Sequence, residues 1–270
     1  MVCKHSLRLK CSLKDTEATV HKNMRMGIGM TGVLQATKEQ KSWLSDAYEY
    51  LREFDKEYSK LNGFPESIKL TTCKPSGTLS LLPRVTTNNS KAGVITPGVH
   101  PNPAGPYYIR RIRISSDSNL IKVCKDNGYK VEHQIKFDGN NDLTTMVVEF
   151  PCKVSEDTPI AANYSWKEQL EAVKWLQKNW SDNSVSCTVY YNKEDLEDIK
   201  NYLVENYKEN FKTLSFLLYQ GHGFIQAPYE TITEEQYYES IKNTKPITSV
   251  EVNEDDFDLQ DCESGACPIK

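Results

Sequence analysis

The sequence has no run of about 18 apolar residues, and this absence excludes a membrane-spanning helix of ordinary length. Residues 1–10 lack the apolar stretch of a secretory signal peptide, so we expect a cytoplasmic protein. Basic residues are not clustered either: residues 251–270 carry seven acidic side chains and one basic one, and the other 250 residues carry 32 basic against 30 acidic. The sequence therefore predicts a globular body with an acidic tail, without a membrane or nucleic-acid partner.

Cysteines are present, but six of the eight show no spacing typical of a metal site. In a cytoplasmic protein, scattered cysteines are ordinarily reduced thiols that pack like small apolar residues. We predict this state for Cys3, Cys11, Cys73, Cys124, Cys152 and Cys187.

The other two cysteines, Cys262 and Cys267, lie near the end of the acidic tail. The tail has few apolar residues, so we expect it to be mobile, and a short flexible loop can bring two sulfurs to bonding distance. Two cysteines are too few for a structural zinc site. A dithiol on a mobile arm can exchange with a buried disulfide, whereas the alternative is an accidental pair in a disordered tail.

Helical and extended patterns alternate along the body of the chain, and this alternation predicts an α/β fold with a partly parallel sheet. The capping box formed by Ser165 and Glu168 marks one helix start. The predicted helices are 36–61, 117–127, 165–180, 194–208 and 233–242. The predicted strands are 68–72, 107–114, 129–135, 144–150, 185–191 and 213–218.

Two segments rich in glycine or proline are harder to assign. Residues 83–106 hold five prolines and are predicted to form a long loop, which is typical of a functional segment or a linker. Gly27, Gly29 and Gly32 have the spacing of a phosphate-binding loop. Because no clear strand precedes them, glycine-mediated close packing against a helix is the favoured alternative.

The segment Ser76-Gly77-Thr78-Leu79-Ser80 follows a predicted strand and Pro75, and it precedes a predicted helix start. Helix starts expose unpaired N–H groups, which suit a phosphate, and Gly77 permits close approach of the backbone. The hydroxyls of Ser76, Thr78 and Ser80 are candidate donors to phosphate oxygens. An ordinary serine or threonine N-cap explains the pattern equally well.

Three arginines lie in the predicted strand 107–114. Alternation along a strand places Arg111 and Arg113 on one face and Arg110 on the other. Arginine can bind phosphate or carboxylate in a bidentate manner, but pairing with acidic residues inside the protein is the alternative.

Several of these segments, in this order, resemble the adenosylcobalamin-dependent (class II) ribonucleotide reductases, and in particular their monomeric ribonucleoside-triphosphate reductases. The resemblance extends from about residue 20 to the end of the chain. The segments that carry it are 25–33, 71–82, 96–101, 107–114, 182–189, 221–223, 226–230 and 262–270.

The resemblance implies a ten-stranded α/β barrel, of which this chain would supply the second half and a C-terminal extension with a flexible tail. Residues 1–82 would form a barrel half with the phosphate-binding loop. Residues 83–244 would be a cobalamin-associated α/β region that completes the barrel, and residues 245–270 a redox tail.

The resemblance also implies a reaction, namely the reduction of ribonucleoside triphosphates to 2′-deoxyribonucleoside triphosphates by a cobalamin-initiated thiyl radical. Ser76, Gly77, Thr78 and Ser80 would bind substrate, and Cys262 and Cys267 would shuttle electrons from thioredoxin. Candidate contacts to the cofactor adenosylcobalamin are His100, Tyr107 and Arg110.

The sequence departs from the family pattern at one point. The radical cysteine of the family lies in an Asn-x-Cys-x-Glu motif upstream of the segment 25–33, and this sequence contains no such motif. We therefore expect a C-terminal part that is inactive without the N-terminal half of the reductase. A non-catalytic module that binds cobalamin, nucleotide or thioredoxin is the alternative, as is an inactive remnant.

Overall fold

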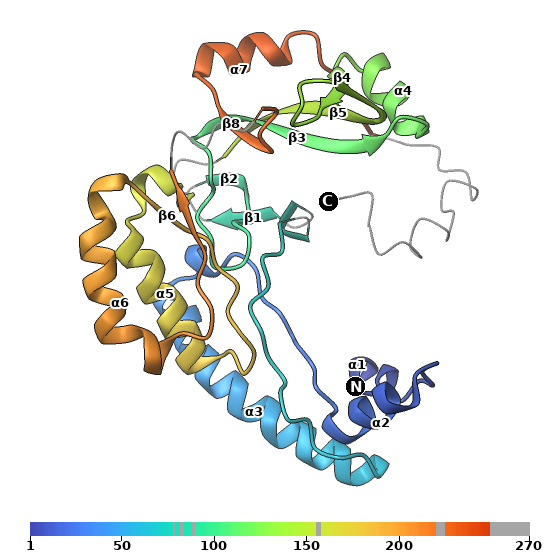
Figure 1. The fold of residues 1–270 in the computed structure, drawn as a ribbon, viewed down its shortest axis with the longest axis vertical. Helices are drawn as coiled ribbons and strands as arrows, with labels where there is room; N and C mark the ends of the chain where they lie inside the picture. Colours follow the sequence, from blue (N-terminus) through green and yellow to red (C-terminus); the bar gives the residue numbers. More distant parts are fainter. Residues whose placement is uncertain (78, 82–83, 88–89, 155–157, 220–224, 249–270) are drawn as a thin grey trace. The chain divides into compact units, whose positions relative to one another are not determined.

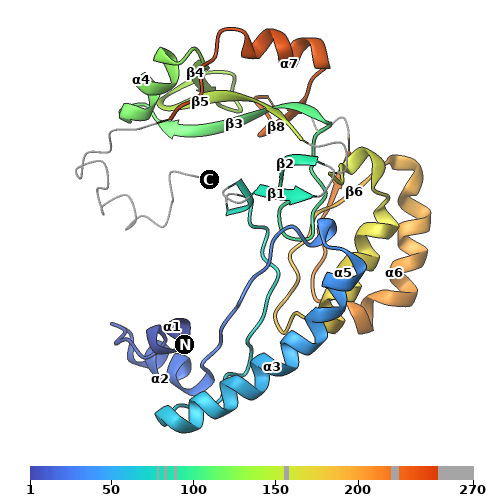
Figure 2. The same cartoon turned by 180° about the vertical axis from the view of Figure 1, so that it is seen from behind.

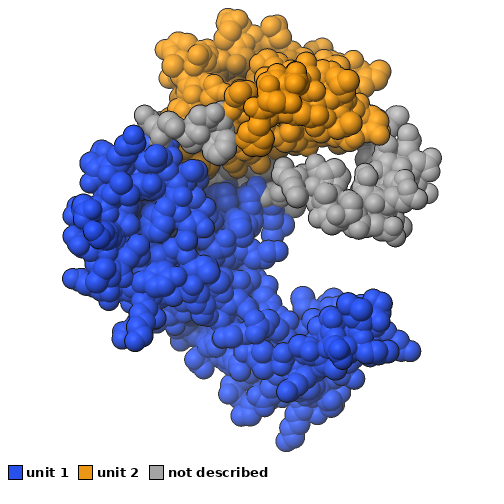
Figure 3. All heavy atoms as spheres, in the orientation of Figure 1, with its two compact units in different colours: residues 1–102, 157–221 blue, residues 103–156, 222–270 orange. Residues whose placement is uncertain are grey.

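The computed structural model describes residues 1–77, 79–81, 84–87, 90–154, 158–219 and 225–248. The chain divides into two compact units, residues 1–102 with 157–221 and residues 103–156 with 222–270 (Figure 3). The role-based division at residues 82 and 244 stays a prediction, because compactness does not report on role.

Unit 1 contains the longer helices, and short polar caps fix where two of them begin. Thr37 and Gln40 form a capping box at the start of one, and Ser165 and Glu168 form one at the start of another. Gly63, with a φ of 64°, ends the first of these helices in the left-handed conformation. The helices of unit 1 are α1 (Val2–Ser6), α2 (Lys14–Asn23), α3 (Lys38–Asn62), α5 (Trp166–Asn179) and α6 (Leu196–Asn210), with 3-10 turns at Val33–Gln35, Leu79–Leu81, Ala161–Asn163 and Lys193–Asp195.

Four extended segments of unit 1 pair in parallel, in the order 26–28, 69–73, 183–191 and 216–218. Bridges join Ile28 to Thr71 and Cys73 to Val185, and β6 (Val189–Tyr191) pairs with β7 (Phe216–Leu218). Helices α3, α5 and α6 lie along one side of these segments (Figures 1 and 2). The partly parallel α/β fold is therefore confirmed, although the described sheets do not close into a barrel.

The core of unit 1 lies between these helices and the parallel segments. Leu170, Val173 and Leu176 project from α5 at three-residue spacing and are almost fully buried. They pack against a cluster that includes Cys73 and Val189. This spacing places the three side chains on one face of the helix, which is the face that it buries.

The predicted loop over residues 83–106 is wrong in part. Strands β1 (Arg84–Thr87) and β2 (Ser90–Val94) form an antiparallel hairpin within it. Strands of four and five residues are too short to show a periodic pattern, so their pairing, and not their own sequence, defines them. The sequence did not predict helices α1 and α2 either. Helix α2 buries none of its residues, so no buried face marks it in the sequence.

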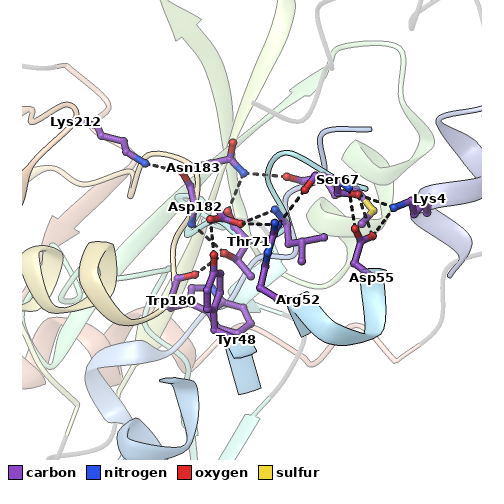
Figure 4. Close-up of polar contacts among 12 residues, drawn as sticks. Lys4, Tyr48, Arg52, Asp55, Ser67, Thr71, Trp180, Asp182, Asn183 and Lys212 are labelled. Atoms are coloured by element: carbon purple, nitrogen blue, oxygen red, sulfur yellow. Dashed lines mark hydrogen bonds and ion pairs between the residues drawn. The ribbon is translucent and has the colours of Figure 1, made fainter. Parts of the chain in front are cut away.

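A buried ion pair attaches α1 to the end of α3 in unit 1 (Figure 4). Lys4 is only 1% exposed, and its Nζ lies 2.6 Å from Oδ1 of Asp55. The same ammonium donates to the hydroxyls of Ser59 and Ser67. The second carboxylate oxygen of Asp55 accepts the Ser67 N–H at 2.8 Å, so both charges have hydrogen-bond partners.

Replacing Lys4 with methionine is expected to lower the free energy of unfolding by about 3–5 kcal/mol, because it leaves a buried carboxylate without its counter-charge. Urea denaturation measures this loss. Lys14→Met is the control, because the Lys14 side chain is 81% exposed and its ion pair with Glu17 is long, at 3.9 Å. Adding Asp55→Leu to Lys4→Met should restore part of the loss, and equal stabilities for all variants would contradict the prediction.

Unit 2 is a four-stranded antiparallel sheet in the order β4-β5-β3-β8. Ile121 and Cys124 of its first helix pack against Met146 and Val148 of the sheet. This helix ends before Gly128, whose φ of 82° and close approach to the backbone of Asn243 leave no room for a side chain. The elements are β3 (Tyr107–Ser115), α4 (Asn119–Asp126), β4 (Lys130–Ile135), β5 (Asn141–Lys153), β8 (Tyr229–Thr231) and α7 (Glu234–Ile241).

Candidate functional site

The carboxyl ends of two neighbouring parallel segments of unit 1 carry Thr31 and Ser76. The Ser76 hydroxyl donates to Oγ1 of Thr31 at 2.8 Å, and Thr31 donates to the carbonyl oxygen of Thr96 at 3.1 Å. Ligands of open parallel α/β sheets bind outside the carboxyl ends of the strands. This end of unit 1 is therefore the candidate functional site, and it includes the predicted phosphate-binding segment.

A third segment, which contains Thr96 and Gly98, completes the site. The N–H of Gly98 donates to Oγ of Ser76 at 2.8 Å and to Oγ1 of Thr31 at 3.1 Å. A side chain at Gly98 would meet the carbonyl oxygen of Lys74 at 2.3 Å, and its φ is 49°, so only glycine fits here. The N–H of Thr96 donates to Oε1 of Gln35 at 2.9 Å, which fixes the segment at its other end.

The residues predicted to bind phosphate differ in their exposure. Ser76 is half-buried, with a φ of 50° that serine rarely adopts. Gly77 is half-buried, and apart from its chain neighbours no heavy atom of the described residues lies within 4 Å of the place a side chain would occupy. Ser80 is buried and donates its N–H to the carbonyl of Ser76, whereas Thr78 lies outside the described residues. Their role in binding substrate stays a prediction.

The sequence did not single out Thr31, Thr96 or Gly98 for this site. Two of the resemblance segments contain them, and this is the only signal that marked them. Nothing local in the sequence indicates that residues 31, 76 and 98 meet.

A second polar cluster lies at the amino ends of the parallel segments (Figure 4). The carboxylate of Asp182 accepts the hydroxyl of Tyr48 and the N–H of Leu70, both at 2.8 Å. Asn183 donates its amide to the carbonyls of Met26 at 2.9 Å and Thr71 at 2.8 Å. Because these bonds join α3 to three parallel segments, the cluster fixes the register of the sheet.

The electrostatics of this cluster follow from its burial. Burial and the hydrogen bond to Asp182 raise the pKa of Tyr48. Burial and the nearby Lys69 lower the pKa of Lys212, which donates to the carbonyl oxygen of Asp182. Arg52 lies 4.0 Å from Asp182 and donates to the carbonyl of Ser67 at 3.0 Å, so it links this cluster to the Lys4 ion pair.

The three glycines at positions 27, 29 and 32 lie in or beside the first parallel segment. A side chain at Gly27 would meet the methyl group of Thr72 at 3.1 Å. The structure therefore supports close packing, although the neighbour is an extended segment and not the expected helix.

The arginines of β3 are engaged within unit 2. Arg111 lies 2.9 Å from Glu149 and 2.6 Å from Glu230, which confirms the alternative of internal ion pairing. Arg113 donates to Oε1 of Gln134 at 3.0 Å and to the carbonyl of Gln226 at 3.2 Å. The sequence alone did not identify these partners, because they come from three separate parts of the chain.

The candidate cobalamin contacts do not share one unit, since His100 lies in unit 1 and Tyr107 and Arg110 lie in unit 2. Burial lowers the pKa of His100, so its imidazole is neutral at neutral pH. The hydroxyl of Tyr107 donates to Glu234 at 2.6 Å, and this bond raises its pKa.

Among the three candidate cofactor contacts, Arg110 alone has a buried hydrogen-bond donor without a partner in the described residues. Its guanidinium lies 4.3 Å from the ring centre of Tyr229, and its Nη1 donates to the carbonyl of Pro228 at 3.1 Å. Its Nε is buried and has no hydrogen-bond partner among the described residues. Because the protein encloses this N–H, a ligand cannot reach it in this conformation, and the role of Arg110 as a cofactor contact stays a prediction.

The cysteines of the described region form no disulfide with one another. Burial, together with the neighbouring Cys187, raises the pKa of Cys73 to about 12, so this thiol stays protonated. Cys262 and Cys267 lie outside the described residues, and their shuttle role stays a prediction.

No helix in the described part of the chain is long and apolar enough to cross a membrane. No family model matches the chain. In sequence it is 34% identical over 266 residues to a probable adenosylcobalamin-dependent ribonucleoside-triphosphate reductase of Dictyostelium discoideum, covering 94% of this chain and 33% of that protein. The corresponding reductase of Lactobacillus leichmannii is 37% identical over 236 residues, covering 83% of this chain and 30% of that protein.

A solved structure agrees with these relatives. The crystal structure of a B12-dependent (class II) ribonucleotide reductase matches 99% of this chain and 39% of its own, with a TM-score of 0.72 and 27% identity. The chain spans about a third of the length of the curated relatives it matches. Sequence and structure together show that this chain is related to one portion of the adenosylcobalamin-dependent (class II) ribonucleotide reductases.

Proposed function

We propose that the chain is the C-terminal part of a reductase that converts ribonucleoside triphosphates to 2′-deoxyribonucleoside triphosphates, with thioredoxin as reductant. The observation that carries this proposal is the match of 99% of the chain to a class II reductase of known structure. The names of the relatives, which specify adenosylcobalamin and ribonucleoside triphosphates, support the cofactor and the substrate.

In this proposal the parallel segments of unit 1 are part of a ten-stranded α/β barrel, and the N-terminal half of the reductase supplies the other strands. Among the described residues, β7 has a neighbouring strand on one side only. An unpaired strand edge is a ready template for a further strand.

In this proposal each group of residues has its own role. The segment 76–80 binds the substrate phosphates, and His100, Tyr107 and Arg110 contact the cofactor. Adenosylcobalamin supplies the radical when it is bound. Cys262 and Cys267 accept electrons from thioredoxin and pass them to the active-site cysteines by thiol–disulfide exchange.

Replacing Ser76 and Thr78 together by alanine is expected to weaken binding of cytidine triphosphate to the full chain by well over tenfold. Removing the Ser76 hydroxyl deletes the bonds to Thr31 and Gly98 that hold the segment in place. Removing the Thr78 hydroxyl deletes a candidate donor to a charged phosphate oxygen, which contributes about 1.5–3 kcal/mol. Isothermal titration calorimetry measures the effect.

The control for this experiment is the double variant Ser184→Ala with Thr213→Ala. It removes another hydroxyl pair, at 2.8 Å, from the amino ends of the parallel segments. If the Ser76 and Thr78 variant bound as tightly as the control, the segment would not bind phosphate.

The absent Asn-x-Cys-x-Glu motif favours a second candidate, a non-catalytic module that binds cobalamin, nucleotide or thioredoxin. The two candidates differ in one outcome. A reductase part should form active enzyme when it is combined with the N-terminal part of a relative, and a binding module should not.

A further inference from the structure

We propose that Thr31 is a positioning residue for the substrate-phosphate segment, because it holds Ser76 in the left-handed conformation. The inference rests on the proposed function for its biological meaning. The geometry of Thr31, Ser76 and Gly98 carries it independently.

The first step concerns the backbone of Ser76. A φ of 50° is unfavourable for a residue with a side chain, so the surrounding structure must compensate for it. Ser76 lies three residues beyond the parallel segment 69–73, and its carbonyl accepts the N–H of Ser80 at 2.9 Å. The conformation of Ser76 therefore sets the direction in which the chain leaves the sheet.

The second step concerns the hydroxyl of Ser76. It has one hydrogen to donate, and this hydrogen goes to Thr31 at 2.8 Å. The oxygen accepts the N–H of Gly98 at 2.8 Å. The Ser76 hydroxyl thus holds the segment in place, and in this conformation it has no hydrogen left for a phosphate oxygen.

The third step concerns Thr31, whose hydroxyl is fully used. It accepts from Ser76 and from Gly98, and it donates to Thr96. Two backbone bonds run beside it, from Gly32 N–H to the Thr96 carbonyl at 2.8 Å and from Val33 N–H to the Gly98 carbonyl at 3.1 Å. Thr31 is therefore anchored on the sheet and on the third segment before it contacts Ser76.

The two hydroxyls therefore have different roles in this proposal. Thr31 does not touch the substrate; it acts through Ser76. No other described residue, chain neighbours apart, lies within 4 Å of the side-chain position at Gly77, so among the described residues the backbone there is open to a bound anion. Loss of the Thr31 hydroxyl would free Ser76 to relax toward negative φ and would redirect the backbone around Gly77.

The test compares Thr31→Val, Thr31→Ser and the wild-type full chain. Hydrogen exchange of backbone amides should accelerate at Gly98 and around Gly77 in Thr31→Val, and it should stay near wild type in Thr31→Ser, which keeps a hydroxyl. Calorimetric titration with inorganic tripolyphosphate should show about tenfold weaker binding for Thr31→Val, the effect of one lost hydrogen bond on positioning. Thr31→Ser should bind like wild type.

Thr213→Val is the matched control, since it also removes a hydroxyl from a pair at 2.8 Å, but at the other end of the parallel segments. It should change neither readout at the site, even if it lowers the melting temperature as much as Thr31→Val does. If a general loss of stability were the cause, Thr31→Val and Thr213→Val would show the same change in amide exchange and in tripolyphosphate affinity. That result would overturn the proposal.

The outcomes separate this proposal from the proposed function. Unchanged amide hydrogen exchange in Thr31→Val would overturn the positioning role, whatever the affinity for tripolyphosphate. Accelerated exchange in a chain whose wild type binds no tripolyphosphate would leave the positioning role standing and count against the phosphate site. Wild-type binding with unchanged affinity in Thr31→Val would refute the positioning role and keep the site.

Discussion

Replacing both Cys262 and Cys267 by serine is expected to abolish turnover driven by thioredoxin while sparing much of the turnover driven by dithiothreitol. The physical reason is access. Thioredoxin is too large to enter the active site, so it must reduce a disulfide on a tail that reaches the active site. A small dithiol can enter the active site directly. Both activities are measured as deoxynucleotide formed by the chain assembled with the N-terminal part of the reductase.

Two other roles for this cysteine pair give different results. A structural disulfide would destabilise the fold when removed, by about 2–5 kcal/mol, and would lower both activities together. An accidental pair would change neither activity. Replacing the exposed Cys3 and the half-buried Cys11 with serine is the control, and it should leave both activities intact.

The second large effect is expected from the 270-residue chain alone, which should form no deoxynucleotide from cytidine triphosphate, adenosylcobalamin and dithiothreitol. The reaction implied by the resemblance requires a thiyl radical on a positioned cysteine, and positioning groups cannot replace that sulfur. No described cysteine substitutes for it. Cys3, Cys11 and Cys152 stand in sequences unlike the family motif, Cys73 and Cys187 are buried in the core of unit 1, and Cys124 is buried in the core of unit 2.

The measurement is a product assay with a complete reductase of the same family as positive control. Adding the N-terminal part of such a reductase should restore product formation. Deoxynucleotide made by the chain alone would refute both the assignment of the radical cysteine and the proposal that the chain is one part of a larger enzyme.

The sequence by itself determined the features that depend on near neighbours. The capping boxes of Thr37 with Gln40 and Ser165 with Glu168 are closed by bonds across three residues, so the starts of α3 and α5 were predictable. The left-handed Gly63 and the three-residue apolar spacing of α5 are equally local. The order of the resemblance segments likewise indicated the family relationship, because it needs no knowledge of contacts.

Only the tertiary structure decided which polar groups meet. Ser76 has its partners 45 and 22 residues away, in Thr31 and Gly98, and Arg111 has a partner 38 residues away in Glu149. The hairpin of β1 and β2 and the three-residue strand β8 exist because a neighbour completes their hydrogen bonds. A hydroxyl or guanidinium group has the same chemistry whether it faces a ligand or another segment of the chain. Which of the two it contacts depends on how distant segments pack.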